Sequence, residues 1–167
     1  MNATRTAGYS PEEFTALHDQ VVDTFSRGGT IADLHGVSDD ECEALYTLGY
    51  GLYEKGRYGD ALKVLGYLVS LNHSEHRYLV ALGAIAQAMA QYTDALQQYM
   101  AATLLHPLEP VPVYYSAQCL LEMGQHAAAV ESCDLAIAMC KHERHAMLLE
   151  RAKALRATAS ARLAKEN

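Results

Sequence analysis

Two stretches of the chain share one pattern: YTLGYGLYEKGRYGDAL at residues 46–62 and VALGAIAQAMAQYTDAL at residues 80–96. Each has Leu-Gly near its start and Asp-Ala-Leu at its end, in the same register. The small residues at two positions continue at equal intervals into a third copy: Gly49, Gly83 and Ala117 at one, and Ala61, Ala95 and Ala129 at the other. A fixed period of this length is typical of stacked helical repeats.

A period of about 34 residues with small residues at fixed positions is the signature of tetratricopeptide repeats, each a pair of antiparallel helices. Small residues are needed where the two helices cross, because bulky side chains would push them apart. We therefore expect Gly49 to face Ala61, and its counterparts to do the same in the other repeats. The sequence predicts an all-α array with three repeats, at residues 42–75, 76–109 and 110–143.

The segment before the repeats, residues 11–41, has the signals of an N-terminal helical region that follows a flexible tail at residues 1–10. Ser10 and Glu13 form a capping box, and Pro11 suits the first helical turn. The apolar residues of this helix fall on one face: Phe14, Leu17, Val21 and Phe25. Because this stripe has no partner within the repeat pattern, we expect it to mediate dimerisation into a homodimer.

Residues 144–167 are predicted to form a C-terminal helix. Its apolar stripe consists of Leu148, Ala152, Leu155 and Ala159, with Arg and Lys elsewhere. A helix with one apolar and one solvated face is what a stacked array needs as a cap.

Composition limits the functional classes. The 167 residues suffice for one domain with a sizeable core. A formal net charge of −7 argues against binding nucleic acid or an anionic membrane through bulk charge. The chain has neither the run of about 18 apolar residues that a membrane span needs nor the apolar core of a signal peptide at its start. We expect a cytosolic protein without direct membrane insertion.

The stretch RGGTIADLHGVSDDECEALYTLGYGLYEKGRYGDALKVLGYLVSLN at residues 27–72 resembles the type III secretion chaperones that serve translocator proteins, a tetratricopeptide group also called class II chaperones. The resemblance lies in a Gly-Gly-Thr turn, a short helix, a Gly-Val-Ser cap and Leu-Tyr at the first repeat, and it extends from about Phe14 through the third repeat. It implies a bacterial cytosolic protein that holds one or two translocator subunits before export, without ATP. It also implies that the N-terminal helical region can support a homodimer.

In a tetratricopeptide stack the first helix of each repeat lines the concave face, and residues off its packing stripe point into the groove. In the first repeat we expect the packing stripe at Leu45, Leu48, Gly49 and Leu52. A second stripe, facing the groove, carries Tyr46, Tyr50 and Tyr53. Moving along the chain by one or two repeat periods gives the other expected groove residues: Val80, Ala84, Gln87, Tyr114, Gln118 and Leu121. We expect Arg77 to provide a charge at the edge of the groove.

The three tyrosines suit an extended peptide ligand. Tyrosine offers a flat apolar ring together with a hydroxyl that can bond a peptide carbonyl. Ala84 leaves space where a larger residue would fill the groove. The resemblance implies that Tyr46, Tyr50 and Tyr53 correspond to the groove aromatics that grip a translocator segment. A different interpretation is that some of them pack against the N-terminal helix.

Other functional classes require different residue patterns. An adaptor that clamps an acidic tail needs Lys and Asn on its inner helices, but tyrosines and aliphatic residues occupy those positions. A generic repeat scaffold for another protein partner remains open. The sequence KHERH offers His142 and His145 but no further metal ligand, and no nucleophile with an evident base is present. We therefore expect neither an enzyme nor a bound metal or cofactor.

Overall fold

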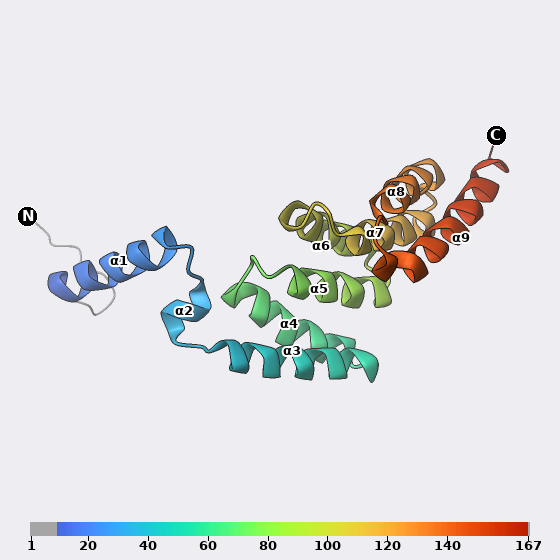
Figure 1. Cartoon of the computed structure of the whole chain (residues 1–167). Coiled ribbons are helices and arrows are strands. Elements are labelled where there is room, and N and C mark those ends of the chain that lie inside the picture. The colour runs from blue at the N-terminus through green and yellow to red at the C-terminus, as the bar shows by residue number, and fades with distance from the viewer. Residues whose placement is uncertain (1–9, 167) are drawn as a thin grey trace, which may run out of the picture.

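The computed structural model describes residues 10–166, and all regular structure within them is helical. The elements are α1 (Pro11–Ser26), α2 (Ile31–His35), α3 (Asp39–Glu54), α4 (Tyr58–Leu71), α5 (His76–Ala88), α6 (Tyr92–Leu105), α7 (Pro110–Glu122), α8 (His126–Met139), the 3-10 turn η1 (Glu143–His145) and α9 (Ala146–Leu163). Three antiparallel pairs, α3 with α4, α5 with α6 and α7 with α8, follow one another in the stack (Figure 1). The predicted all-α repeat fold is confirmed.

The first helix begins with the capping box that its sequence predicts, and the next two begin in the same way. Ser10 with Glu13, Thr30 with Asp33, and Ser38 with Glu41 each form a complete capping box. The carboxylate of each box accepts hydrogen bonds from the capping residue, which lowers its pKa. The tail expected at residues 1–10 lies outside the described residues except for Ser10.

The second helix of each pair begins differently. Residue 56, 90 or 124, just before it, has a positive φ, and no side chain caps the helix. Two of these positions hold glycine, which adopts this left-handed conformation readily, but the middle one holds Ala90 with φ of 58°. A left-handed turn thus reverses the chain within each repeat.

The helix crossings explain the regular spacing of the small residues. A Cβ on Gly49 would lie 2.8 Å from Cγ of Leu65, and one on Gly83 would lie 2.6 Å from the Tyr99 ring. The atoms nearest to that Cβ on Gly49 thus belong to Leu65 and Val64. Leu65 lies one helical turn beyond Ala61 on the same face of α4. Ala61 is still fully buried in the core.

Leu48 is also placed differently from the expectation that it packs. Its side chain is 53% exposed, whereas Leu82, which occupies the same position of the second repeat, packs against the first repeat's core. No repeat precedes the first, so about half of Leu48 stays exposed in the part of the chain that the structure describes. The packing stripe of α3 is therefore narrower than that of α5.

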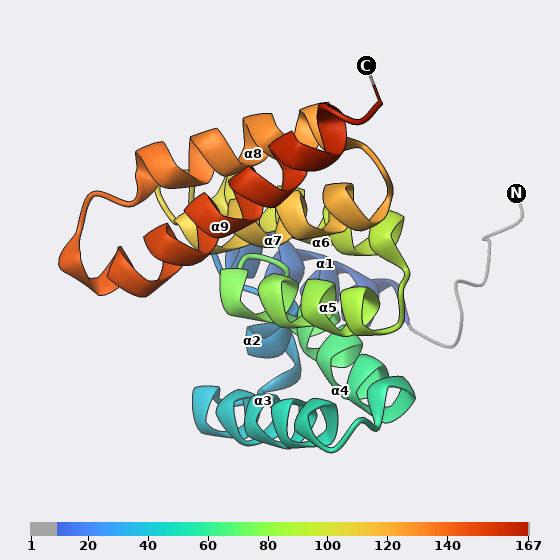
Figure 2. The same ribbon diagram turned by 90° about the vertical axis from the view of Figure 1, so that its right-hand side faces the viewer.

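The two ends of the stack are closed to different degrees. α9 lies along α8 and also contacts α7, as Figure 2 shows at the end opposite to α3 and α4, and it buries Ala152 and Ala159. α1, in contrast, has no buried residue and packs against α2 alone among the described elements. No helix in residues 10–166 has both the length and the apolar character needed to cross a membrane.

Candidate functional site

A hollow of about 350 Å³ opens between the first helices of the three repeats. Four predicted groove residues line it, namely Tyr53 from α3, Ala84 and Gln87 from α5, and Gln118 from α7. The other lining residues are Ala88, Tyr92, Tyr99, Tyr115 and Glu122. We call this hollow, together with Tyr46, Tyr50 and Tyr53 of α3, the tyrosine groove.

The tyrosines of α3 form a continuous row of rings that leads to this hollow. The ring centroids of Tyr46 and Tyr50 are 6.4 Å apart, and those of Tyr50 and Tyr53 are 6.1 Å apart. Tyr50 is exposed, whereas Tyr46 and Tyr53 are half-buried against the first repeat's core. None of the three packs against α1, since α1 contacts α2 alone among the described elements, so that alternative interpretation is wrong.

Burial favours the neutral form of the tyrosine phenols in and near the groove. It raises the pKa of Tyr46 and of Tyr53, and it raises that of the fully buried Tyr99 much further. All three phenols are therefore neutral near pH 7 and can donate hydrogen bonds. The groove combines apolar ring faces with hydroxyl donors, without a charge of its own on the rings.

The floor of the hollow is a chain of hydrogen bonds that links three helices. The Tyr99 hydroxyl donates to Gln87 Oε1 over 2.9 Å, and Gln87 Nε2 donates to Gln118 Oε1 over 3.1 Å. Gln118 Nε2 in turn donates to the Tyr114 hydroxyl over 2.9 Å. Both amides are held in one orientation, and each keeps a second N–H available to a ligand carbonyl.

Arg77, which we expected as a charge at the groove edge, is paired with two carboxylates. Its Nη2 lies 3.1 Å from Glu43 Oε2 on α3, and its Nε lies 3.2 Å from Glu75 Oε1. Its guanidinium stands over the Tyr46 ring, 5.2 Å from the centroid. Arg77 therefore ties α3 to α5 and holds the first ring of the tyrosine row.

Two predicted groove residues belong to the core instead. Tyr114 and Leu121 are only 6% and 4% exposed. Tyr114 lies in a cluster with Ala152 of α9, and Leu121 in one with Ala159. Their placement in an open groove is wrong because α9 covers this face of α7. Val80 is half-buried in the core cluster of the second repeat.

Sequence reasoning missed three aromatic walls of the hollow. Tyr92 occupies the position of the second repeat that Tyr58 occupies in the first. The Tyr58 ring lies 5.8 Å from that of Tyr53, so the repeat pattern could have indicated that Tyr92 lies near the groove tyrosines. The pattern predicts only packing for Tyr99, whose hydroxyl contributes the first bond of the floor. Tyr115 stacks on Tyr99 at 5.6 Å, although the equivalent position of the second repeat is Ala81.

The histidines of KHERH lie at the connection between α8 and α9. The rings of His142 and His145 are 5.9 Å apart, and His145 Nε2 lies 3.4 Å from Glu109 Oε1. Residues 10–166 contain no group of three or more His, Cys, Asp or Glu side chains arranged to hold a metal ion. The four cysteines are unpaired by disulfides, and burial raises the pKa of each thiol.

Comparison with known proteins identifies relatives of the chain. No protein-family model matches it. It is 40% identical over 109 residues to low calcium response locus protein H of Yersinia pestis, a match that spans 65% of either chain. It is 30% identical over 117 residues to chaperone protein SicA of Salmonella typhimurium, covering 70% of this chain and 71% of the relative.

Solved structures agree with these relatives. The type III secretion translocator chaperone SycD of Yersinia enterocolitica superposes with a TM-score of 0.75 at 34% identity, covering 78% of this chain and 98% of that one. Pseudomonas aeruginosa PcrH in complex with the chaperone binding region of PopD gives 0.73 at 34% identity, covering 76% and 96%. SicA and SycD are named as chaperones, and a second crystal structure of SycD shows an alternative dimer. The chain belongs to the family of tetratricopeptide type III secretion chaperones that serve translocators.

Proposed function

We propose that this protein is a bacterial cytoplasmic chaperone that binds an extended segment of a translocator protein in the tyrosine groove. The observation that carries the proposal is the aromatic hollow of about 350 Å³, in a fold that is shared with PcrH in complex with a chaperone binding region. Binding keeps the client soluble and competent for secretion until export, with no catalytic step, metal or cofactor.

The client's chemistry explains why such a carrier is needed. A translocator must later enter a membrane, so its apolar segments would aggregate or insert prematurely in the cytoplasm. The ring faces of the tyrosine row can cover such a segment, while the amides of Gln87 and Gln118 offer donors to its backbone carbonyls. The net charge of −7 keeps the loaded carrier soluble.

The proposed binding residues follow from exposure and position. They are Tyr46, Tyr50, Tyr53, Ala84, Gln87, Tyr92, Tyr115 and Gln118. Arg77 acts through Tyr46, whose ring it holds. We further propose that the N-terminal helical region mediates a homodimer through the stripe Phe14, Leu17, Val21 and Phe25.

The test compares two tyrosines of similar exposure. Tyr50 is 46% exposed on α3 at the groove, and Tyr67 is 51% exposed on α4. Affinity is measured by fluorescence anisotropy with labelled peptides that tile the proteins encoded by the neighbouring open reading frames. We expect Tyr50→Ala to weaken binding by about 1 kcal/mol or more and Tyr67→Ala to leave it unchanged.

Two results would contradict the proposal. Equal affinities of the two variants would place the ligand elsewhere on the stack. Failure to bind any translocator peptide, together with capture of a folded domain, would favour a generic repeat scaffold. Circular dichroism of both variants shows whether the fold is intact.

A further inference from the structure

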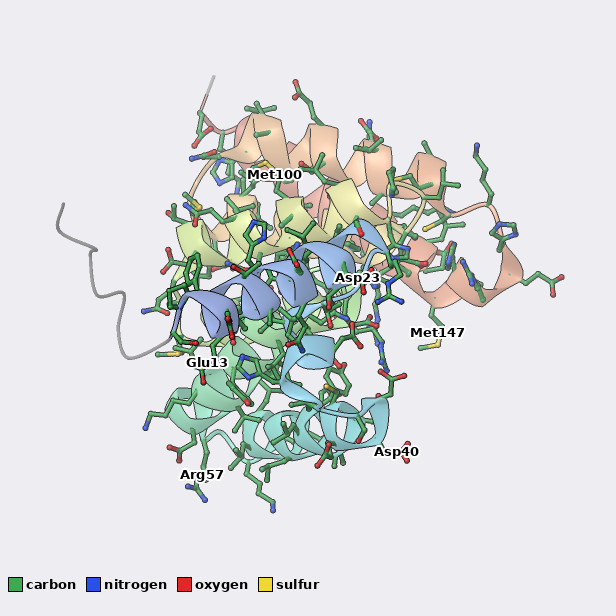
Figure 3. The ribbon with its side chains drawn as sticks, turned by 90° about the vertical axis from the view of Figure 1, so that its left-hand side faces the viewer. Glu13, Asp23, Asp40, Arg57, Met100 and Met147 are labelled. Atoms are coloured by element: carbon green, nitrogen blue, oxygen red, sulfur yellow. The ribbon has the colours of Figure 1, made fainter. Side chains whose placement is uncertain are left out.

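A buried tyrosine lies behind the floor of the tyrosine groove. Tyr99 belongs to α6, the second helix of its repeat, and its side chain is fully buried. Met100, the next residue along α6, is exposed and lies at the molecular surface in Figure 3. Tyr99 instead points towards the first helices, where its hydroxyl donates to Oε1 of Gln87 on α5. Tyr99 can therefore influence the groove without an accessible surface of its own.

The hydrogen bonds of the floor run in one direction, and Tyr99 stands at the donor end. A buried hydroxyl must donate its proton to an acceptor, because an unpaired buried donor costs free energy. For Tyr99 that acceptor is Oε1 of Gln87, which turns Nε2 of Gln87 towards Oε1 of Gln118. Nε2 of Gln118 then donates to the hydroxyl of Tyr114 at the acceptor end.

The two amides can reverse this direction only together. A flipped Gln118 would set its Nε2 against Nε2 of Gln87, which are both donors. A flipped Gln87 would set its Oε1 against Oε1 of Gln118, which are both acceptors. Reversal of the pair would let Tyr114 donate to Gln118, but it would leave the proton of Tyr99 buried without an acceptor.

Burial decides which of the two tyrosines donates into the row. Two hydroxyls at the ends of a pair of amides cannot both donate inwards, because the amides supply one acceptor and one donor at the ends of the row. Tyr99 is 0% exposed and Tyr114 is 6% exposed, so the hydroxyl that accepts is the less buried one. The direction of the row is therefore set from the side of Tyr99.

We propose that Tyr99 is a positioning residue for client binding: its hydroxyl fixes the direction of the amide pair so that Gln87 and Gln118 donate to main-chain carbonyls of the client. The inference rests on the proposed chaperone function and names the group that is recognised. Both amides line the hollow, and in the observed direction each has one N–H that the row does not use. Main-chain carbonyls occur in every sequence, so this contact suits segments with different side chains.

Removal of one hydroxyl at each end of the row tests the proposal in the full chain. Tyr99→Phe keeps the ring but removes the donor, so the amide pair can reverse and let Tyr114 donate. Tyr114→Phe removes the acceptor and leaves the direction set by Tyr99. Each variant loses one buried hydroxyl and one hydrogen bond, so the two form a matched pair.

The probe is the labelled peptide of the tiling set that binds the parent most tightly. We expect Tyr99→Phe to weaken its binding about threefold or more, and Tyr114→Phe to change it less than about twofold. Both variants should lose similar stability in urea, because each loses the same kind of buried hydrogen bond. A purely structural role of the hydroxyls would therefore not separate the two affinities.

A second pair of variants tests whether Tyr99 acts through Gln87. Gln87→Met keeps an unbranched side chain but has no amide to orient. In that background, Tyr99→Phe should cause no further loss of peptide affinity, whereas independent effects would add. The same substitution should raise the stability of Gln87→Met, since it removes a buried hydroxyl that has lost its acceptor.

Three outcomes would overturn the proposal: Tyr99→Phe that binds like the parent, equal losses in Tyr99→Phe and Tyr114→Phe, or an additive loss in the Gln87→Met background. In each of them the parent still binds peptide, so the proposed chaperone function stands. A parent that binds no peptide would instead contradict the chaperone function, and this inference with it.

Discussion

The two ends of the repeat stack have opposite designs. At the C-terminal end α9 covers the last repeat and buries Tyr114 and Leu121, whose counterparts in the first repeat, Tyr46 and Tyr53, are only half-buried. At the N-terminal end α1 contacts none of the repeat helices among the described residues, and Leu48 and Tyr50 stay exposed. The same repeat sequence thus provides stability where a neighbour covers it and a binding surface where none does.

The difference follows from how a repeat array gains stability. Each helical pair buries its apolar face only against its neighbours, so a terminal pair has one face that something else must cover. α9 meets this need with small buried residues, Ala152 and Ala159, that allow it to approach closely. On the side away from α5, the first repeat contacts only α2 among the described elements, which leaves its outer surface for partners.

Two leucines, one at each end of the stack, should show the largest difference in stability when they are substituted. Leu121→Ala removes a buried side chain under α9, so we expect a loss of about 2–5 kcal/mol in the free energy of unfolding. Leu48→Ala removes an exposed side chain and should change it by no more than about 0.5 kcal/mol. Urea denaturation of both variants measures the difference. Similar losses would show that the first repeat is covered in solution.

Two glycines allow the same comparison between a closely packed position and an open one. A Cβ on Gly83 would lie 2.6 Å from the Tyr99 ring, so Gly83→Ala should destabilise the fold by about 1–3 kcal/mol. Gly51 lies in α3 with no atom within 4 Å of a Cβ placed on it. Gly51→Ala should therefore stabilise the fold by about 0.5–1 kcal/mol, because alanine favours helix. A change of the same sign at both sites, in thermal or urea unfolding, would contradict this account.

The stack could be predicted from the sequence because its information is local and periodic. Small residues that recur once in every repeat indicate the helix pairs, and Ser38 with Glu41 marks the start of the first repeat. The burial of Tyr114 could not be obtained by stepping along the repeat period from Tyr46, because it depends on α9, which lies outside the repeat. The hydrogen bonds of Gln87 were equally hidden, because their partners come from two other helices.

Substitutions in the three left-handed turns within the repeats should change stability less. Their effect depends on the backbone conformation and not on which elements cover the ends of the stack. Ala90 has a φ of 58° where the other repeats hold Gly56 and Gly124. Ala90→Gly should stabilise the fold by up to about 1 kcal/mol, and Gly56→Ala should destabilise it by about 1–2 kcal/mol. Opposite shifts of Tm at the two sites would show that the repeats unfold as one cooperative unit. A shift at only one site would indicate that the open end unfolds separately.

The smallest expected effect is a pH dependence at the junction between the first two repeats. Burial lowers the pKa of His76 below 6.5, and the nearby His106 lowers it further. The His76 and His106 rings are 4.7 Å apart. Glu75 and Glu109 oppose this shift, and Arg77 adds to it.

The sign follows from that direction. Because the fold favours neutral His76, its contribution to stability is present above pH 6.5 and is lost as the pH falls through the lowered pKa. We expect the parent to lose more stability between pH 7.5 and pH 5 than His76→Gln does. The capping-box carboxylates titrate below this range, since their pKa values are lowered. His73→Gln is the control, because His73 is exposed. Parallel pH profiles of urea unfolding for the parent and His76→Gln would show that this junction opens to water, which would extend the loosely closed region from the first repeat into the second.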